Sequence, residues 1–251
     1  MALRRKLIAG NWKLHKTVEE SLELAGQLSA GLKRDDLDVL VCPTFPALFP
    51  VAQRLKGTAV KVGAQNLFWE DQGAFTGEVS GPMIKAAGAI YALVGHSERR
   101  LHFAESEKTA ALRVAAAWRS GLTPILCVGE LLQERETGRM EGVLESQLAG
   151  ALAGVSTAQA GGLVIAYEPV WAIGTGKTAS DAQANEAHAY IRGWLSYRFD
   201  KHVAESLKIL YGGSVKPANA AGLLNQSEVD GVLVGGASLD ASSFLGIIHA
   251  I

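Results

Sequence analysis

Short apolar runs alternate along the chain with longer stretches in which apolar and polar residues mix at helical spacing. Eight of these runs are almost continuously apolar, as strands that are covered on both faces must be. The stretches between them, such as the one that reads TAALRVAAAWRSGL, have the length and pattern of helices. The eight predicted strands cover residues 6–10, 38–42, 60–65, 90–95, 123–128, 163–168, 208–212 and 231–235.

The alternation of strand and helix predicts an α/β fold with a parallel sheet. Eight repeats of this unit favour closure of the sheet into a (β/α)₈ barrel, and an open doubly wound sheet is the alternative. No linker or low-complexity segment divides the sequence. We therefore expect residues 1–251 to form a single barrel domain.

Charge and composition exclude several classes of partner. The chain carries 24 Lys and Arg residues against 25 Asp and Glu residues, so it lacks a strong basic field for nucleic acid or an anionic membrane. The sequence contains no run of about 18 apolar residues, and we expect no signal peptide because the apolar stretch after the first basic residues is too short. Cys42 and Cys127 lie inside apolar runs, which predicts buried thiols in a reduced, cytoplasmic protein and no metal site.

Polar residues and glycines follow the predicted strands. The carboxyl ends of the strands in a (β/α)₈ barrel share one rim, and active sites are built there. We therefore expect residues that are far apart in the sequence to meet in one polar, glycine-rich pocket. These residues are Asn11, Lys13, Gln65, Asn66, His96, Glu130, Glu168, Gly212, Gly213, Ser214, Gly235 and Gly236.

Glu168 is the candidate general base. It ends a predicted strand and precedes Pro169, which favours extended backbone at the residue before it. Residues 169–177 follow, and their apolar tip at 172–174 is typical of a lid rather than of a solvated loop. A lid that excluded water from the carboxylate would make it a stronger base. A solvated or salt-bridged carboxylate is the alternative.

His96 is the candidate hydrogen-bond donor of the pocket. Ser97 and Glu98 follow it, and both residue types are favourable at the start of a helix. A backbone N–H at a helix start can only donate, so an imidazole that accepts from it carries its proton on the other nitrogen. The positive end of the helix also disfavours imidazolium. The sequence thus predicts a neutral histidine that donates into the pocket, and a structural histidine is the alternative.

Two features are suited to an anionic ligand. Lys13, close to Asn11, would place an ammonium group at the mouth of the pocket, although most lysines are solvated surface charges. The glycines at 212–213 and 235–236 follow the last two strands, where such barrels often bind phosphate through backbone N–H groups. Tight turns would explain each pair separately, but two pairs at this place favour a phosphate site.

Seven stretches of the chain read AGNWKLH, AQNLFWEDQGAFTGEVS, VGHSERR, CVGE, AYEPVWAIGTGK, YGGSV and DGVLVGGASL. Together they resemble the triosephosphate isomerase family. The resemblance implies a TIM barrel that interconverts dihydroxyacetone phosphate and glyceraldehyde 3-phosphate, in glycolysis and gluconeogenesis. The reaction would pass through an enediolate and would need neither a cofactor nor a metal.

The same resemblance implies roles for individual residues. Glu168 would carry the proton between carbons, His96 would polarise the carbonyl group, and Lys13 would neutralise negative charge. Glu98 and Glu130 would support these groups without reacting. The implied substrate-binding residues are Asn11, Lys13, Gly174, Ser214, Gly235 and Gly236.

The resemblance further implies a homodimer. The loop from Gln65 to Val79 contains three aromatic residues, including Phe75, which suggests docking rather than solvation. This loop would insert into a twofold partner, with Thr76 near Asn11 of the partner subunit. Packing of the loop against its own barrel is the alternative.

Two positions depart from the family pattern. Ala104 stands where glycine is usual, and Pro82 follows Gly81 instead of the commoner Ser-Pro order. Neither is a proposed reacting group, so only local loop geometry is affected. Two other functions stay open: a phosphate-binding barrel for a larger sugar phosphate, and a barrel that binds without catalysis.

Overall fold

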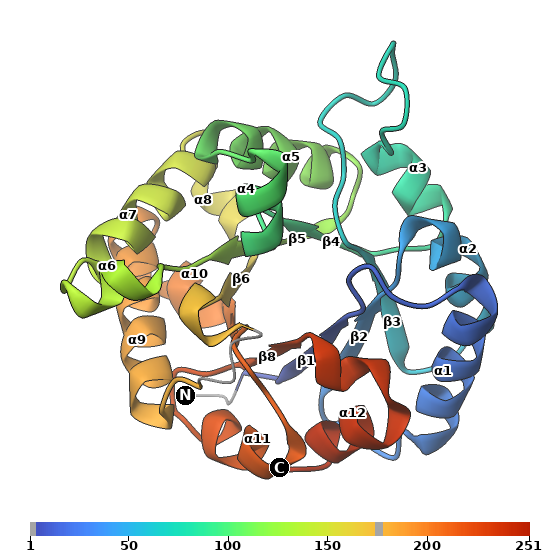
Figure 1. The fold of residues 1–251 in the computed structure, drawn as a ribbon. Helices are drawn as coiled ribbons and strands as arrows, with labels where there is room; N and C mark the ends of the chain where they lie inside the picture. Colours follow the sequence, from blue (N-terminus) through green and yellow to red (C-terminus); the bar gives the residue numbers. More distant parts are fainter. Residues whose placement is uncertain (1–3, 174–177) are drawn as a thin grey trace.

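The computed structural model describes residues 4–173 and 178–251, and its eight parallel strands form a closed barrel (Figure 1). Each strand pairs with the next one along the chain, and β8 pairs with β1. The strands are β1 (Leu7–Asn11), β2 (Asp38–Cys42), β3 (Val60–Ala64), β4 (Tyr91–Val94), β5 (Thr123–Val128), β6 (Val164–Tyr167), β7 (Lys208–Tyr211) and β8 (Gly231–Val234).

Helices form a ring around the strands, as Figure 1 shows in a view down the barrel. Side chains that accept from backbone N–H groups begin several of them, such as Thr17 before α1. In the described part of the chain, no helix is both long enough and apolar enough to cross a bilayer. The helices are α1 (Val18–Gly31), α2 (Phe45–Arg54), α3 (Gly81–Ala86), α4 (Ser97–Phe103), α5 (Glu107–Arg119), α6 (Leu132–Glu136), α7 (Met140–Ala151), α8 (Thr157–Ala160), η1 (Val170–Ala172), α9 (Asp181–Arg198), α10 (Lys201–Ser206), α11 (Pro217–Leu224), η2 (Gly236–Leu239) and α12 (Ala241–Ile248).

The closed barrel confirms the predicted fold class and excludes the open doubly wound sheet. The strands at 38–42 and 123–128 have the predicted bounds. The first strand lies one residue later than predicted, so Asn11 is its last residue. The remaining five strands end one residue earlier than predicted, because the ladder stops where the residues of the rim begin. Those rim residues are Gln65, Gly95, Glu168, Gly212 and Gly235.

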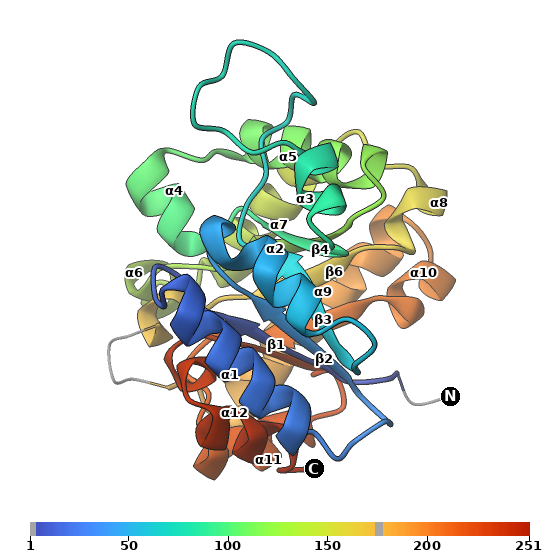
Figure 2. The ribbon, with the colours of Figure 1, turned by 90° about the vertical axis from the view of Figure 1, so that its right-hand side faces the viewer.

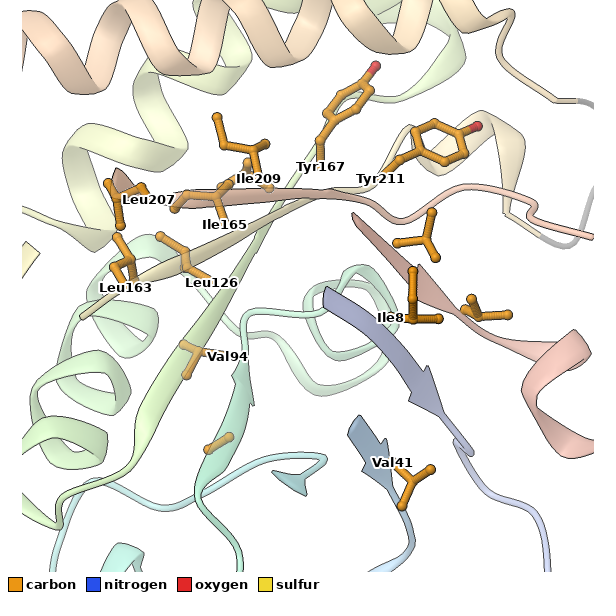
Figure 3. Packing of buried hydrophobic residues seen from close by; sticks show 14 of the residues in the cluster. Ile8, Val41, Val94, Leu126, Leu163, Ile165, Tyr167, Leu207, Ile209 and Tyr211 are labelled. Atoms are coloured by element: carbon orange, nitrogen blue, oxygen red, sulfur yellow. The ribbon is translucent and has the colours of Figure 1, made fainter. Parts of the chain in front are cut away.

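The core has two layers, one on each side of the barrel wall. Successive side chains of a strand point to opposite faces, so Leu7 and Leu40 lie in a different cluster from their neighbours Ile8 and Val41. The cluster with Leu7 and Leu40 fills the inside of the barrel. The cluster with Ile8 and Val41 packs between the strands and the helices, and Figure 3 shows part of this outer layer. This packing holds the strand ends, and therefore the rim, in fixed positions.

Cys42 and Cys127 are buried free cysteines, as the apolar runs predict. Both belong to the cluster inside the barrel. Burial raises the pKa of the Cys42 thiol to about 12, so this thiol stays protonated near neutral pH. The thiols therefore serve as packing groups rather than as nucleophiles.

The loop between β3 and α3 projects beyond the ring of helices (Figures 1 and 2). Its base packs against its own chain, because Phe68 is buried and its ring lies 4.1 Å from that of Trp69. The ring of Phe75 lies 4.6 Å from that of Phe68, yet Phe75 is 44% exposed. Thr76 is also exposed. The loop thus carries apolar surface that its own barrel does not cover.

Ala104 ends α4 in the left-handed region, with φ 53° and ψ 32°. This conformation costs an L-residue about 1–2 kcal/mol and costs glycine almost nothing. The departure from the family pattern is therefore a local strain at the C-terminal end of α4.

We expect Ala104→Gly to raise the free energy of unfolding by about 0.5–1 kcal/mol, because relief of the strain exceeds the added chain entropy of glycine. Denaturant unfolding of the two proteins measures the difference. A matched Ala149→Gly substitution on the exposed side of α7 should instead lower stability. A loss of stability in Ala104→Gly would contradict the strain.

Candidate active site

The carboxyl ends of the strands open into a cavity of about 370 Å³. It lies where the sequence predicts the pocket, because parallel strands of a barrel end on one rim. The predicted residues that line this cavity are Asn11, Lys13, His96, Glu168, Gly212, Gly213, Ser214, Gly235 and Gly236.

Three other residues of the predicted site do not line the cavity. The side-chain amide of Gln65 donates to the carbonyl oxygen of Lys13 (2.9 Å), and Asn66 accepts from a buried arginine of α5 (3.1 Å). Glu130 is fully buried. Gly174 lies outside the described residues, so its predicted role has no structural description.

Glu168 follows the last residue of β6, and its side chain turns back toward α4. One carboxylate oxygen, Oε1, lies 3.0 Å from Nε2 of His96. The other, Oε2, accepts the backbone N–H of Ser97 (2.9 Å). The side chain is only 2% exposed. The carboxylate is thus buried beside the imidazole.

The contacts of Glu168 decide its charge. Burial raises the pKa of a carboxyl group, whereas the neighbouring His96 and the N–H of Ser97 lower it. Together these contacts outweigh the effect of burial, so the pKa of Glu168 lies below its ordinary value. Glu168 is therefore ionised near neutral pH, as a general base must be.

His96 is the residue before α4, and its ring Nδ1 accepts the backbone N–H of Glu98 (3.2 Å). A nitrogen that accepts a hydrogen bond carries no proton, so this contact favours a neutral ring with its proton on Nε2. Burial lowers the pKa of His96, but the carboxylate of Glu168 raises it more, and the net direction is upward. The N-terminus of α4 and the carboxylate thus act in opposite directions on the ring.

Lys13 has a strained backbone, with φ 51° in the left-handed region. Its N–H donates to Oδ1 of Asn11 (3.0 Å), and Gln65 holds its carbonyl oxygen. Its Nζ lies 2.5 Å from Oε1 of Glu98. Strained non-glycine residues persist where the surrounding structure holds them, often at functional sites. The ammonium group is thus placed at the cavity by backbone contacts and one ion pair.

Glycines give the last two strands their close approach to the site. A Cβ atom on Gly212 would lie 2.8 Å from Cγ of Glu168, and one on Gly235 would lie 3.2 Å from Cε of Lys13. Any larger residue at these positions would displace a charged group of the cavity. The backbone N–H of Ser214 donates to the carbonyl oxygen of Ala172 (3.1 Å). Its hydroxyl is the group that can donate to a ligand without breaking this bond.

Glu130 supports the segment that follows Glu168. Its Oε1 accepts from the hydroxyl of Tyr167 (3.0 Å) and from Nε1 of Trp171 (2.9 Å). Its carbonyl oxygen accepts the N–H of Val170 (3.1 Å). Burial raises the pKa of Glu130. The side chain therefore fixes both ends of the turn from β6 into η1 and lies away from the cavity.

Lys216 lines the cavity but was not identified from the sequence. It stands directly before α11 and two residues after Ser214, in a segment that already belongs to the rim. That position is the signal that would identify it. Throughout the described ranges, no three His, Cys, Asp or Glu side chains gather as metal ligands. The other residues of the lining are Ile173, Val215, Leu233 and Ala237.

The family model for triosephosphate isomerase matches residues 6–251 of the chain. The chain is 51% identical over 249 residues to a triosephosphate isomerase of Trichlorobacter lovleyi, and 49% identical over 248 residues to one of Geotalea uraniireducens. Both alignments cover 98% of this chain and 99% of the relative. The chain belongs to the triosephosphate isomerase family. This result confirms the resemblance seen in the sequence.

A solved member of the triosephosphate isomerase family has the same fold. The crystal structure of triosephosphate isomerase from Bartonella henselae matches with a TM-score of 0.89 at 40% identity. The match covers 98% of each chain. The chain is therefore similar to this family of isomerases in both its sequence and its barrel fold.

The contacts above predict how Glu168 responds to a change at His96. We expect His96→Gln to raise the pKa of Glu168, because the substitution removes the imidazole contact that lowers this pKa and leaves the burial unchanged. Carbon-13 NMR of labelled glutamate, recorded as a function of pH, measures this value. An unchanged or lower pKa would show that His96 does not hold the carboxylate in its ionised form.

Proposed function

We propose that the chain is a triosephosphate isomerase, which interconverts dihydroxyacetone phosphate and D-glyceraldehyde 3-phosphate. The single observation that carries the proposal is the 3.0 Å approach of the ionised Glu168 to Nε2 of His96 inside one cavity. A proton next to a carbonyl group is weakly acidic, and its removal needs a base and a donor placed together. The reaction belongs to glycolysis and gluconeogenesis.

Glu168 and His96 divide the chemistry between them. The carboxylate removes a proton from one carbon and returns it to the next. Nε2–H of His96 donates to the carbonyl oxygen, and the proton of the neighbouring hydroxyl group passes between the two oxygens, so that one oxygen gains the proton that the other loses. Negative charge builds on the carbonyl oxygen in the enediolate-type intermediate, and the ammonium group of Lys13 stabilises it. Donors that are already in place need no reorganisation as the charge appears. General base catalysis alone typically contributes about 10²–10⁴-fold.

Substrate binding must exchange contacts at His96. In this structure Oε1 of Glu168 occupies the place at Nε2 that a substrate carbonyl oxygen needs. When the substrate takes that place, the carboxylate loses the contact that lowers its pKa, and burial then raises the pKa. The same exchange removes the group that raises the pKa of His96. Binding therefore makes Glu168 a stronger base and the imidazole more stable as a neutral donor.

The phosphate group of the substrate faces the last two strands. The glycine backbone at Gly235 and Gly236, the hydroxyl of Ser214 and the ammonium group of Lys13 are suited to bind it. The role of Gly174 stays a prediction from the sequence. Asn11 orients Lys13 through its side-chain oxygen. Because the chain has a net charge of −1 and no strong positive field, these local groups must attract the phosphate.

The size of the cavity favours a small substrate. A volume of about 370 Å³ lies near the low end of the range for small-molecule pockets, about 300–1,000 Å³. A larger sugar phosphate is therefore the weaker alternative. A coupled assay that compares glyceraldehyde 3-phosphate with larger aldose phosphates separates the two. Failure to interconvert the two triose phosphates would leave a binding protein without catalysis.

We expect Glu168→Asp to lower kcat by about 10²-fold or more, because the carboxylate retracts by one methylene group while the fold is retained. The coupled isomerase assay measures kcat, and circular dichroism checks the fold. Glu19→Asp, an exposed substitution on α1, is the matched control and should keep wild-type activity. Wild-type turnover in Glu168→Asp would exclude this residue as the base.

We also propose that two copies of the chain form a cytoplasmic homodimer, each copy being a single barrel domain. The projecting loop between Gln65 and Val79 supports this proposal, since it exposes Phe75 and Thr76. Leu14, next to Lys13 at the rim, is 93% exposed and offers apolar surface for a partner. Buried, unpaired thiols fit a reducing compartment.

We expect Phe75→Glu to convert the dimer into a monomer, because the substitution places a charge in the buried interface. Light scattering coupled to size-exclusion chromatography measures the mass. Tyr197→Glu, at a position that is 91% exposed on α9, serves as control and should remain dimeric. A wild-type mass equal to that of one chain would refute the homodimer.

A further inference from the structure

Gln147 lies on α7, away from the cavity that holds the substrate, and its side-chain amide contacts the backbone of a single residue. Its Nε2 donates to the carbonyl oxygen of Gly129 (3.1 Å), and its Oε1 accepts the N–H of Gly129 (2.8 Å). One side chain thus satisfies both backbone groups of Gly129, in the way that a neighbouring strand would. Such a paired contact fixes position and orientation together.

Gly129 in turn lies against the backbone of Glu168. A Cβ atom on Gly129 would lie 1.7 Å from the carbonyl oxygen of Glu168, so the two main chains are in direct contact. On either side of this contact, Glu168 N–H donates to Val128 O (2.7 Å) and Val170 N–H donates to Glu130 O (3.1 Å). The segment 128–130 therefore lies between the amide of Gln147 and the proposed base.

The segment 128–130 borders a cavity on one side, so hydrogen bonds rather than close packing hold it there. A second cavity, of about 280 Å³, borders Gly129, Gln147 and Glu168. Val143 and Cys127 also line it. Close packing normally holds a backbone segment in place, but here one side of the segment faces a cavity. The two hydrogen bonds between Gln147 and Gly129 therefore position the segment on that side.

We propose that Gln147 is a positioning residue for isomerisation, and that it acts through Gly129 on the backbone of Glu168. The proposal rests on the proposed function of Glu168 as the base. Gln147 does not touch the substrate. It sets where the main chain of Glu168 lies, and so how closely the carboxylate approaches the reacting carbon and His96. Displacements of about 1 Å at such a group can cost about 10²-fold in rate.

Gln147→Met keeps the length of the side chain and removes both hydrogen bonds. We expect kcat to fall about 10- to 100-fold while KM stays within about threefold, because the phosphate contacts lie elsewhere. Gln147→Glu still accepts from Gly129 N–H but turns a carboxylate oxygen toward the carbonyl oxygen of Gly129, so it should also lower kcat. Gln27→Met is the control: Gln27 is exposed and its side chain donates to Glu23 within α1, so the substitution should leave kcat unchanged.

A general loosening of the fold would give a different pattern, which two further measurements detect. The inhibition constant of inorganic phosphate should be unchanged in Gln147→Met. In the Glu168→Asp background, Gln147→Met should cost less in kcat than in the wild type, because coupled residues are non-additive. Equal losses in both backgrounds, or wild-type kcat in folded Gln147→Met, would overturn the proposal. Should Gln147→Met fail to fold, Gln147→Glu decides by the same measurements. A wild-type chain without isomerase activity would refute the proposed function instead.

Discussion

The N-terminus of α4 is the feature on which the rest of the site depends. Two successive backbone N–H groups there hold both partners of the proposed proton transfer: Ser97 donates to Glu168 (2.9 Å), and Glu98 donates to the ring of His96 (3.2 Å). Backbone donors cannot change their protonation state, so they fix the imidazole as an acceptor at Nδ1 and a donor at Nε2. The start of this one helix therefore favours both an ionised carboxylate and a neutral imidazole.

The barrel turns this local contact into a site by bringing distant strand ends to one rim. β4 leads into His96 and β6 into Glu168, and the core holds the two strands in register through β5. Gly129, just past β5, lies against the backbone of Glu168, and the side chain of Gln147 bonds to both backbone groups of Gly129. The backbone of the proposed base is thus placed by main-chain contacts, whereas its carboxylate contacts Ser97 and His96.

The sequence predicted the fold and the lining of the cavity more fully than the contacts within it. Continuous apolar runs mark buried parallel strands, and in a closed barrel the residue after each strand must lie on the rim. That logic identifies His96 and Glu168. It does not identify Lys216 or Gln147, or the left-handed backbone of Lys13, because these depend on contacts between elements whose spacing no local pattern encodes. The contact of Glu168 with Ser97 could not be predicted for the same reason.

The protonation of His96 in the presence of a ligand tests this account most directly. Nitrogen-15 NMR of the labelled ring, with a phosphorylated mimic of the enediolate bound, reports each nitrogen separately. The account predicts a proton on Nε2 and none on Nδ1 across the neutral pH range. A ring that carries protons on both nitrogens would show that α4 does not hold the imidazole neutral, and would contradict the division of roles between His96 and Glu168.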